Sequence, residues 1–404
     1  MRGLALLLVA LLAAVPAAAI DKPRDWQPPP LLRIPNHREI YRQAVIELAS
    51  YAKSRNPNFV VLMRGGVELL VKGEYEELWE QIHDPTGKNF QKRLPVGTPM
   101  RPLIKVLDGL VLDGLYCGPY RFEEPLAKAI KARKDLDAQL AAERRQGIHR
   151  PPTPVPVGPF SNDPAEELRK AAEARAKELR LEVQRRVMYA VDAMVSEGRR
   201  IVALENCADQ KQADAAFRDG DRDRVLTFAA VGDQRLDQLP KSRPHQENAR
   251  QAATVVEAKN WLPLLKADRF GSRAQFVMAM EGTNYDVVAV DVAYRGGDAL
   301  VKSDIYRMKF KNVGTPRLVL AVLPVGRAFD WRWYWQKDWE AGNPGFLFAV
   351  DDEPGAFITD IGDPDWRKIM GKYLTGIMDL GFDGVLLDDV GTYRWFEELM
   401  PLEG

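Results

Sequence analysis

The clearest pattern of hydrophobic positions lies near the C-terminal end of the chain. Apolar side chains recur there at three- and four-residue spacing, which predicts an amphipathic helix. They are Trp366, Ile369, Met370, Tyr373, Leu374 and Ile377. Gly381 follows where such a helix would need a left-handed cap. The apolar run 385–387 then predicts a strand buried on both faces, and it ends in Asp388 and Asp389.

A helix, a tight turn, a buried strand and an acid form the repeating unit of a (β/α)8 barrel, in which functional groups lie where strands end. Asp388 therefore becomes a candidate functional residue. The alternative is that Asp388 only caps the next helix, because aspartate is a favoured N-cap residue. This stretch alone leaves both interpretations open.

Short buried strands alternate with helical segments along most of the chain, which predicts a parallel α/β architecture. The strands are predicted at 59–62, 104–112, 201–204, 225–229, 286–290, 318–323, 346–350 and 385–387. A polar connection runs from 230 to the Trp261–Leu262 region. Four strand ends carry an acid: Asp113, Glu205, Asp291 and Asp388. Because all strands of a closed barrel end at one mouth, these acids favour a (β/α)8 TIM barrel.

Residues 123–186 differ from this pattern. Two charged helical stretches flank a linker at 150–159 that holds five prolines. This predicts a helical hairpin inserted between the first part of the barrel, 20–122, and the remainder, 187–404. A solvated stalk is the simpler interpretation, and binding of a protein partner through the helices of 123–198 stays open.

The first 19 residues predict a secretory signal, with Arg2, an apolar core at 4–14 and small residues at 17–19. No later stretch is apolar enough to span a bilayer. We therefore expect an exported protein, either periplasmic or extracellular. Lys plus Arg number 57 and Asp plus Glu number 57, a balance that gives no support for nucleic-acid binding.

The remaining composition predicts neither a metal nor a cofactor. The four histidines are scattered without metal-ligand spacing, and no glycine-rich loop of the phosphate-binding type is present. Cys117 and Cys207 are the two cysteines, too few for a disulfide framework or a zinc site. An exported address permits a bridge between them, and two free thiols are the alternative.

Several segments together resemble the endo-α-1,4-polygalactosaminidase family of glycoside hydrolases. The run from Gly381 to Asp388 is similar to that family's Gly-Phe-Asp-Gly-Val-Tyr-Leu-Asp strand. The segment 317–335 is similar to a second family segment, and 285–291 and 363–366 also fit. The resemblance covers most of the chain outside 123–186.

The order of these segments differs from that of the family. The units that resemble 39–122 and 199–240 follow the Gly-Phe-Asp-Gly strand in the family, whereas they precede it here. The resemblance therefore implies a circularly permuted barrel, a change that exposed loops tolerate. We expect the strand at 384–388 to pair with the strand at 59–62.

The resemblance implies endo-acting hydrolysis of a galactosamine-containing polysaccharide. This reaction needs two carboxyl groups, one that donates a proton and one that acts as a base or nucleophile. Asp388 matches the base or nucleophile, Asp113 stands at the position of the acid, and Glu205 is a substitute acid. The residues implied in substrate binding are Asp291, Arg332, Tyr334 and Trp335.

Three departures from the family pattern bear on activity. Gly326-Arg327-Ala328-Phe329 replaces Gly-Glu-Ala-Glu, Gly391 replaces an aspartate, and Asp113 replaces a glutamate that is one methylene longer. A shift of that size can cost ~10²-fold in rate. The alternative is a barrel that has lost turnover and binds glycan or a protein partner.

Overall fold

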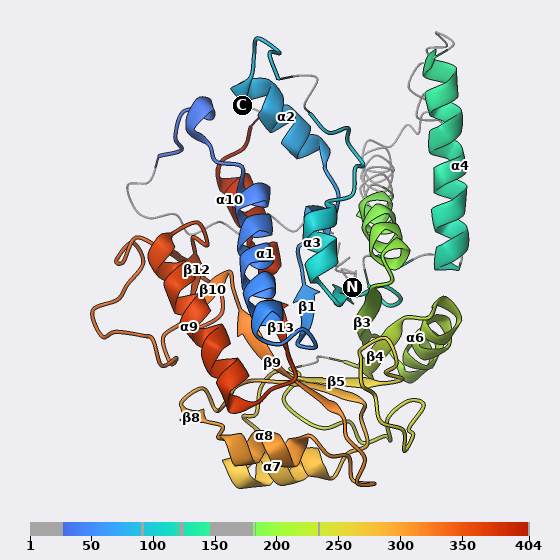
Figure 1. The fold of residues 1–404 in the computed structure, drawn as a ribbon, viewed down its shortest axis with the longest axis vertical. Coiled ribbons are helices and arrows are strands. Elements are labelled where there is room, and N and C mark those ends of the chain that lie inside the picture. The colour runs from blue at the N-terminus through green and yellow to red at the C-terminus, as the bar shows by residue number, and fades with distance from the viewer. Residues whose placement is uncertain are drawn as a thin grey trace, which may run out of the picture.

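The computed structural model describes residues 27–89, 93–118, 120–121, 125–145, 181, 183–232 and 235–402. Eight parallel strands form one sheet in the order β4-β3-β2-β1-β13-β9-β6-β5 (Figure 1). They are β1 (Val60–Arg64), β2 (Gly109–Asp113), β3 (Arg200–Cys207), β4 (Leu226–Val231), β5 (Trp261–Leu264), β6 (Val287–Val290), β9 (Leu318–Pro324) and β13 (Gly384–Asp388). The order around the sheet follows the order along the chain. The predicted parallel α/β barrel is thereby confirmed.

The two edge strands, β4 and β5, contact each other and nearly close the sheet. Phe228 on β4 and Trp261 on β5 pack edge to face, with ring centroids 6.4 Å apart. The buried indole N–H of Trp261 donates to the carbonyl of Ala203 at 3.2 Å. Between β4 and β5, aromatic packing therefore takes the place of the backbone hydrogen bonds that join the other neighbouring strands.

Strand β13 lies between β1 and β9, as the expected pairing of 384–388 with 59–62 requires. Val60 is opposite Gly384 and Met63 is opposite Leu387. A Cβ atom at Gly384 would lie 2.4 Å from the carbonyl oxygen of Val60, so only glycine fits this position without a shift of backbone. The register therefore depends on a residue without a side chain.

Helices cover the outside of the sheet (Figure 1). Residues 183–196 are helical, and the other described helices are α1 (His37–Arg55), α2 (Glu74–His83), α3 (Arg101–Val106), α4 (Leu126–Arg145), α6 (Gln210–Asp223), α7 (Arg273–Glu281), α8 (Lys302–Met308), α9 (Pro364–Leu380) and α10 (Tyr393–Leu399). Helix α9 is the predicted amphipathic helix. The Asp363 carboxylate caps its start, and Gly381 ends it in the left-handed conformation, with φ of 93°. Of the described helices, none has the length and apolarity needed to cross a bilayer.

Two strand predictions were wrong in detail. The predicted strand 104–112 begins only at Gly109, because residues up to Val106 form α3, which carries proline in its first turn. The predicted strand 346–350 corresponds to β11 (Leu347–Val350), which lies outside the barrel. It pairs with β12 (Ala356–Thr359) in a small antiparallel sheet that also contains β10 (Arg327–Phe329).

The eighth barrel strand, β5, comes from the segment at the end of the predicted polar connection. Pro263 interrupts its strand pattern, because proline cannot donate to a ladder. Two further short strands, β7 (Ala293–Tyr294) and β8 (Asp298–Ala299), form a hairpin whose turn contains Gly296 and Gly297.

The predicted insertion is described in part. Its first helix is α4, whereas residues 146–180 lie outside the described residues, as do residues 1–19 with the predicted signal. The helical residues 183–196 place Val187, Val191 and Met194 in the core. Lys134 of α4 pairs with Asp192 at 2.7 Å. The described end of the second helical stretch therefore packs against the barrel.

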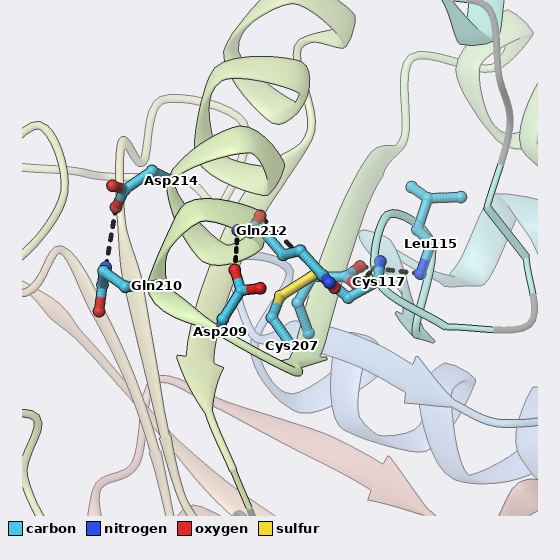
Figure 2. Close-up of a disulfide and its surroundings, with 8 residues drawn as sticks. Leu115, Cys117, Cys207, Asp209, Gln210, Gln212 and Asp214 are labelled. Atoms are coloured by element: carbon cyan, nitrogen blue, oxygen red, sulfur yellow. Dashed lines mark hydrogen bonds between the residues drawn. A yellow bond between two sulfur atoms is a disulfide. The ribbon is translucent and has the colours of Figure 1, made fainter.

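A disulfide joins Cys117, in the loop after β2, to Cys207 at the end of β3 (Figure 2). Of the two alternatives for the cysteines, the structure therefore contains the disulfide and not two free thiols. The bond ties together two loops at the C-terminal ends of neighbouring strands. One of these loops follows directly on Asp113.

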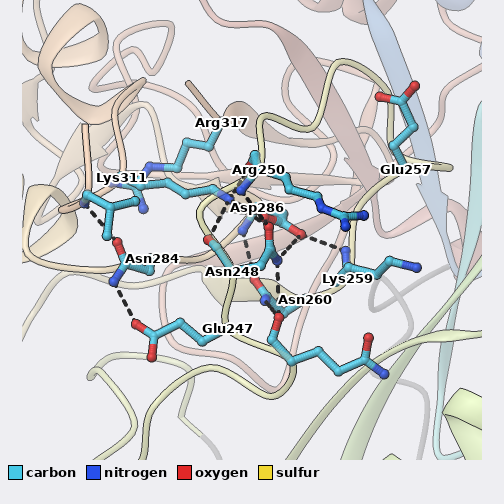
Figure 3. Close-up of polar contacts among 12 residues, drawn as sticks. Glu247, Asn248, Arg250, Glu257, Lys259, Asn260, Asn284, Asp286, Lys311 and Arg317 are labelled. Atoms are coloured by element: carbon cyan, nitrogen blue, oxygen red, sulfur yellow. Dashed lines mark hydrogen bonds and ion pairs between the residues drawn. The ribbon is translucent and has the colours of Figure 1, made fainter. Parts of the chain in front are cut away.

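A buried polar network holds the long connection between β4 and β5, whose residues 235–260 contain no helix (Figure 3). Lys311 is fully buried and pairs with the carboxylate of Asp286. Asp286 also accepts from the backbone N–H of Lys259 at 2.6 Å, and Lys311 donates to the carbonyl of Arg250 at 2.6 Å. Because both charges are paired and hydrogen-bonded, the network fixes the connection without a helix.

The register of β13 can be tested with Gly384→Ala. The added methyl would collide with backbone, so we expect the free energy of unfolding to fall by about 1–3 kcal/mol in urea titrations. Gly376→Ala in α9 is the matched control, because its Cβ would meet no atom within 4 Å. We expect that change to be neutral or to stabilise by up to ~1 kcal/mol. Equal effects of the two changes would contradict the register.

Candidate functional site

A cleft of about 1140 Å³ opens at the mouth of the barrel, where the parallel strands end. Arg64, Asp113 and Asp388 line it as the last residues of β1, β2 and β13. Asp291 lines it directly after β6. Three of the four predicted strand-end acids therefore meet at one cleft, as the barrel geometry predicts. Glu205 is not among its lining residues.

Arg64 joins two of these acids. Its Nε atom lies 3.0 and 3.1 Å from the two carboxylate oxygens of Asp113, and its Nη1 atom lies 3.1 and 3.3 Å from those of Asp388. The guanidinium thus offsets the repulsion between the carboxylates of Asp113 and Asp388, which the converging strands bring close to each other. Partial burial raises the pKa of the Asp113 carboxyl, and the charge of Arg64 opposes that rise.

Asp388 does not cap a helix. Its carboxylate accepts a hydrogen bond from the backbone N–H of Asp389 at 2.9 Å, and η4 (Val390–Thr392) and α10 that follow have no side-chain cap. The alternative interpretation from the sequence is therefore not supported. Asp388 points its carboxylate to Arg64 and the cleft.

Asp389 is the second carboxyl at the end of β13. It has a left-handed backbone, with φ of 57°, and its side chain is 20% exposed. The nearest cation is Arg327, whose Nη1 atom lies 3.7 Å from the carboxylate. Burial and, next, the negative charge of Asp388 raise the pKa of Asp389 to about 7, against the opposing charges of Arg327 and Arg64. The two adjacent carboxyls thus have different environments.

Asp291 and Arg332, both implied in substrate binding by the resemblance, form a bidentate ion pair with each other. The Nη1 and Nη2 atoms of Arg332 donate to the two oxygens of Asp291 at 2.6 and 2.7 Å. Asp291 also accepts from the backbone N–H of Ala293 at 3.0 Å. Both side chains line the cleft, so the pair forms part of its wall.

Tyr334 and Trp335, the aromatic residues predicted to bind substrate, do not line the cleft. Tyr334 is buried, and its hydroxyl accepts from the backbone N–H of Phe329 at 3.1 Å. The rings of Trp335 and Phe357 pack at a tilt of 32° with centroids 4.8 Å apart, and neither Tyr334 nor Trp335 lines the cleft. Trp331 does line it and is 39% exposed. The geometry therefore offers Trp331, rather than Tyr334 or Trp335, to a ligand in the cleft.

Glu205 has a structural role. It is fully buried, and its two oxygens accept from the backbone N–H groups of Leu115 and Cys117, each at 2.8 Å. Burial raises its pKa to about 7, although these hydrogen bonds oppose the rise. Together with the disulfide, Glu205 fixes the loop that follows Asp113.

The sequence argument did not assign a role to Arg64, Arg327 or Asp389. Arg327 pairs with Asp351 at 3.2 Å and approaches Glu353 at 3.8 Å, in addition to Asp389. A signal for Arg64 existed, because it ends a strand predicted to neighbour the strand of Asp388. The role of Arg327 depends on the small antiparallel sheet, which the sequence pattern did not predict.

The cleft is nearly balanced in charge. Seven cationic side chains line it, against eight carboxyls, one of which is Asp389 with its raised pKa. The cations are Arg64, Arg235, Lys266, Arg295, Arg327, Arg332 and Arg394, and the carboxyls are Asp113, Asp268, Asp291, Asp351, Asp352, Glu353, Asp388 and Asp389. Within the described ranges, no group of three or more His, Cys, Asp or Glu side chains is arranged to hold a metal ion.

Comparison with known proteins finds relatives whose names give no activity. No family model matches the chain. An uncharacterized protein of Methanocaldococcus jannaschii is 26% identical over 161 residues, which are 40% of this chain and 45% of that protein. One of Thermotoga maritima is 29% identical over 147 residues, 36% of this chain and 45% of that protein. One of Deinococcus radiodurans is 39% identical over 79 residues, 19% and 26% of the two chains.

The matched part of this chain spans less than half the length of these curated relatives. The names of these relatives state no substrate or partner.

The environment of Asp389 predicts a pH-dependent stability. Its folded-state pKa is raised from about 4 to about 7, so the folded state binds more protons than the unfolded state between these pH values. The contribution of Asp389 to stability is therefore lost as pH rises through that window. We expect Asp389→Asn, which also tolerates a left-handed backbone, to gain at least ~1 kcal/mol relative to the native chain between pH 4 and pH 8.

The measurement is urea unfolding of both proteins across that pH range. Asp379→Asn, at an exposed ion pair with Arg55, is the control and should follow the native chain. A constant difference between Asp389→Asn and the native chain would contradict the raised pKa.

Proposed function

We propose that the cleft binds a polysaccharide and hydrolyses its glycosidic bonds, with Asp388 as the base. The observation that carries this proposal is the position of Asp388 at the end of β13, in a cleft that also holds Asp113 and Asp389. Glycoside hydrolysis needs a carboxylate and a carboxylic acid on either side of one bond. Asp388 directs its carboxylate into this cleft, where it pairs with Arg64 at 3.1 Å.

The walls of the cleft supply groups suited to sugars. The exposed face of Trp331 offers a surface on which a sugar ring stacks, and the charged pairs offer hydrogen-bonding groups to hydroxyls. A polymer with many free amines would favour a strongly acidic cleft, whereas this one is nearly balanced. We therefore propose uncharged units, such as N-acetylated galactosamine, over free galactosamine.

A specific observation favours a second candidate function, binding without turnover. Arg64 pairs with both Asp113 and Asp388, and Arg332 pairs with Asp291 through both oxygens. A carboxylate that shares its lone pairs with arginine is a weaker base or nucleophile than a free one. In this alternative the cleft holds a glycan or a protein segment and cleaves nothing.

Two further proposals concern the whole chain. The pairing of β13 with β1 supports a circular permutation relative to the polygalactosaminidase-like barrels that the sequence resembles. The disulfide between Cys117 and Cys207 supports export to the periplasm or beyond, because such bonds persist in oxidising compartments.

The decisive assay compares the native protein with Asp388→Asn on galactosamine-containing polymers, N-acetylated and deacetylated. We expect the substitution to lower the rate of cleavage by ~10²–10⁴-fold, because it removes the base. Asp379→Asn, far from the cleft on α9, is the matched control and should cleave normally. Cleavage that survives in Asp388→Asn would remove Asp388 from the mechanism. Binding of polymer without cleavage by the native protein would establish the second candidate function instead.

A further inference from the structure

We propose that Asp389, and not Asp113, donates the proton to the leaving oxygen. The assignment rests on the proposed function, since it names the second catalytic group of the same site. It concerns a residue that the sequence argument left without a role. Three observations carry it: the contacts of Asp113, the contacts of Asp389, and the backbone that holds Asp389 in place.

Asp113 is poorly suited to donate a proton. Both of its oxygens lie within 3.1 Å of the Nε atom of Arg64, and its side chain is 49% exposed. A permanent positive charge at hydrogen-bonding distance favours the ionised form of a carboxyl. The contact with Arg64 therefore opposes the rise in pKa that burial causes at Asp113, and it occupies both oxygens that would carry the proton.

Asp389 has the opposite surroundings. Its side chain lines the cleft, is four-fifths buried, and has Arg327 at 3.7 Å as its nearest cation. Among the described residues, no hydrogen bond to its carboxyl oxygens is formed, since the contact with Arg327 at 3.7 Å is too long to be one. A carboxyl that is buried without donors and beside another negative charge retains its proton. The raised pKa of Asp389 agrees with this geometry.

The backbone shows that Asp389 is held in this place. Its left-handed conformation turns the chain at the end of β13, and the Thr392 hydroxyl donates to its carbonyl at 2.7 Å. Gly326, after β9, lies so close that a Cβ atom there would be 2.4 Å from the carbonyl oxygen of Asp389. The absence of a side chain at Gly326 thus makes room for this turn. The close packing of the Asp389 backbone against Gly326 therefore holds the Asp389 carboxyl in the cleft.

Arg64 contacts two of the three carboxyls directly. Its Nη1 atom pairs with Asp388, and the negative charge of Asp388 is, after burial, the next cause of the raised pKa of Asp389. Two carboxyls in different environments are the pattern of an acid and a base in one site. The Nε atom of the same guanidinium contacts both oxygens of Asp113, so Asp389 is the carboxyl of the three with no arginine nitrogen closer than 3.7 Å.

Asp389 gives its proton to the glycosidic oxygen while the bond from this oxygen to the anomeric carbon breaks, and the freed sugar leaves as an alcohol. A water molecule adds to the anomeric carbon, and Asp388 takes its proton. One water is consumed, and the two carboxyls return to their starting states by exchanging protons with solvent.

The test uses two aryl oligoglycosides of the cleaved sugar, one with a phenol that leaves poorly and one with dinitrophenol. A poor leaving group needs the acid, whereas dinitrophenolate leaves without a proton. We expect Asp389→Asn to lose ~10²–10⁴-fold in kcat/KM on the first substrate and less than about tenfold on the second. Asp388→Asn should lose activity on both. Retained cleavage of the dinitrophenyl substrate also shows that Asp389→Asn is folded.

The pH profile gives an independent result. With the phenyl substrate, the rate of the native protein should fall as pH rises above about 7, because Asp389 then loses its proton. This fall should persist in Asp113→Asn and disappear in Asp389→Asn.

The outcomes distinguish the two proposals. If the native protein cleaves and Asp389→Asn behaves like it on both substrates, Asp389 is not the donor, although the hydrolase remains. The same conclusion follows if the dependence on leaving group appears in Asp113→Asn instead. If the native protein cleaves no glycoside, the proposed function fails, and the role of Asp389 fails with it.

Discussion

The parallel pairing of β13 with β1 and β9 is the constraint on which the rest of the structure depends. Met63 lies opposite Leu387, so Arg64 and Asp388 arrive at the same level of the barrel mouth. The neighbouring pair of β1 with β2 sets Arg64 beside Val111 and brings Asp113 within reach of the guanidinium. A shift of one residue would send these side chains to the opposite face of the sheet. The ion pairs of the site are thus a consequence of register.

Electrostatic compensation explains how so many acids share one cleft. Each of the pairs Arg64–Asp388, Arg332–Asp291 and Arg327–Asp351 removes repulsion that strand convergence creates. Asp389 is the exception, because the closest cation remains 3.7 Å away and its burial favours the neutral form. Arg327 also lies 3.8 Å from Glu353, so one guanidinium offsets the charge of several acids at the edge of the cleft.

The sequence predicted those parts of the fold that rest on local pattern. The spacing of apolar residues in α9 and the uninterrupted apolar runs of β9 and β13 identified these elements. The strand β5 was missed because Pro263 breaks its pattern, and β11 was misplaced because an apolar run does not reveal which sheet it joins. The barrel topology alone predicted that Asp113, Asp291 and Asp388 meet at one cleft. It did not predict that Glu205 stays out of this cleft, because its hydrogen-bond partners Leu115 and Cys117 are distant in sequence.

The central claim is that strand-end carboxyls meet and set each other's charge, and one titration tests it most directly. The carboxyl ¹³C signal of Asp389 would be followed by NMR against pH in the native protein and in Asp388→Asn. We predict a pKa of about 7 in the native protein and a lower pKa in the variant, because the neighbouring negative charge is gone. An ordinary aspartate pKa in the native protein, or a pKa unchanged by Asp388→Asn, would contradict the account.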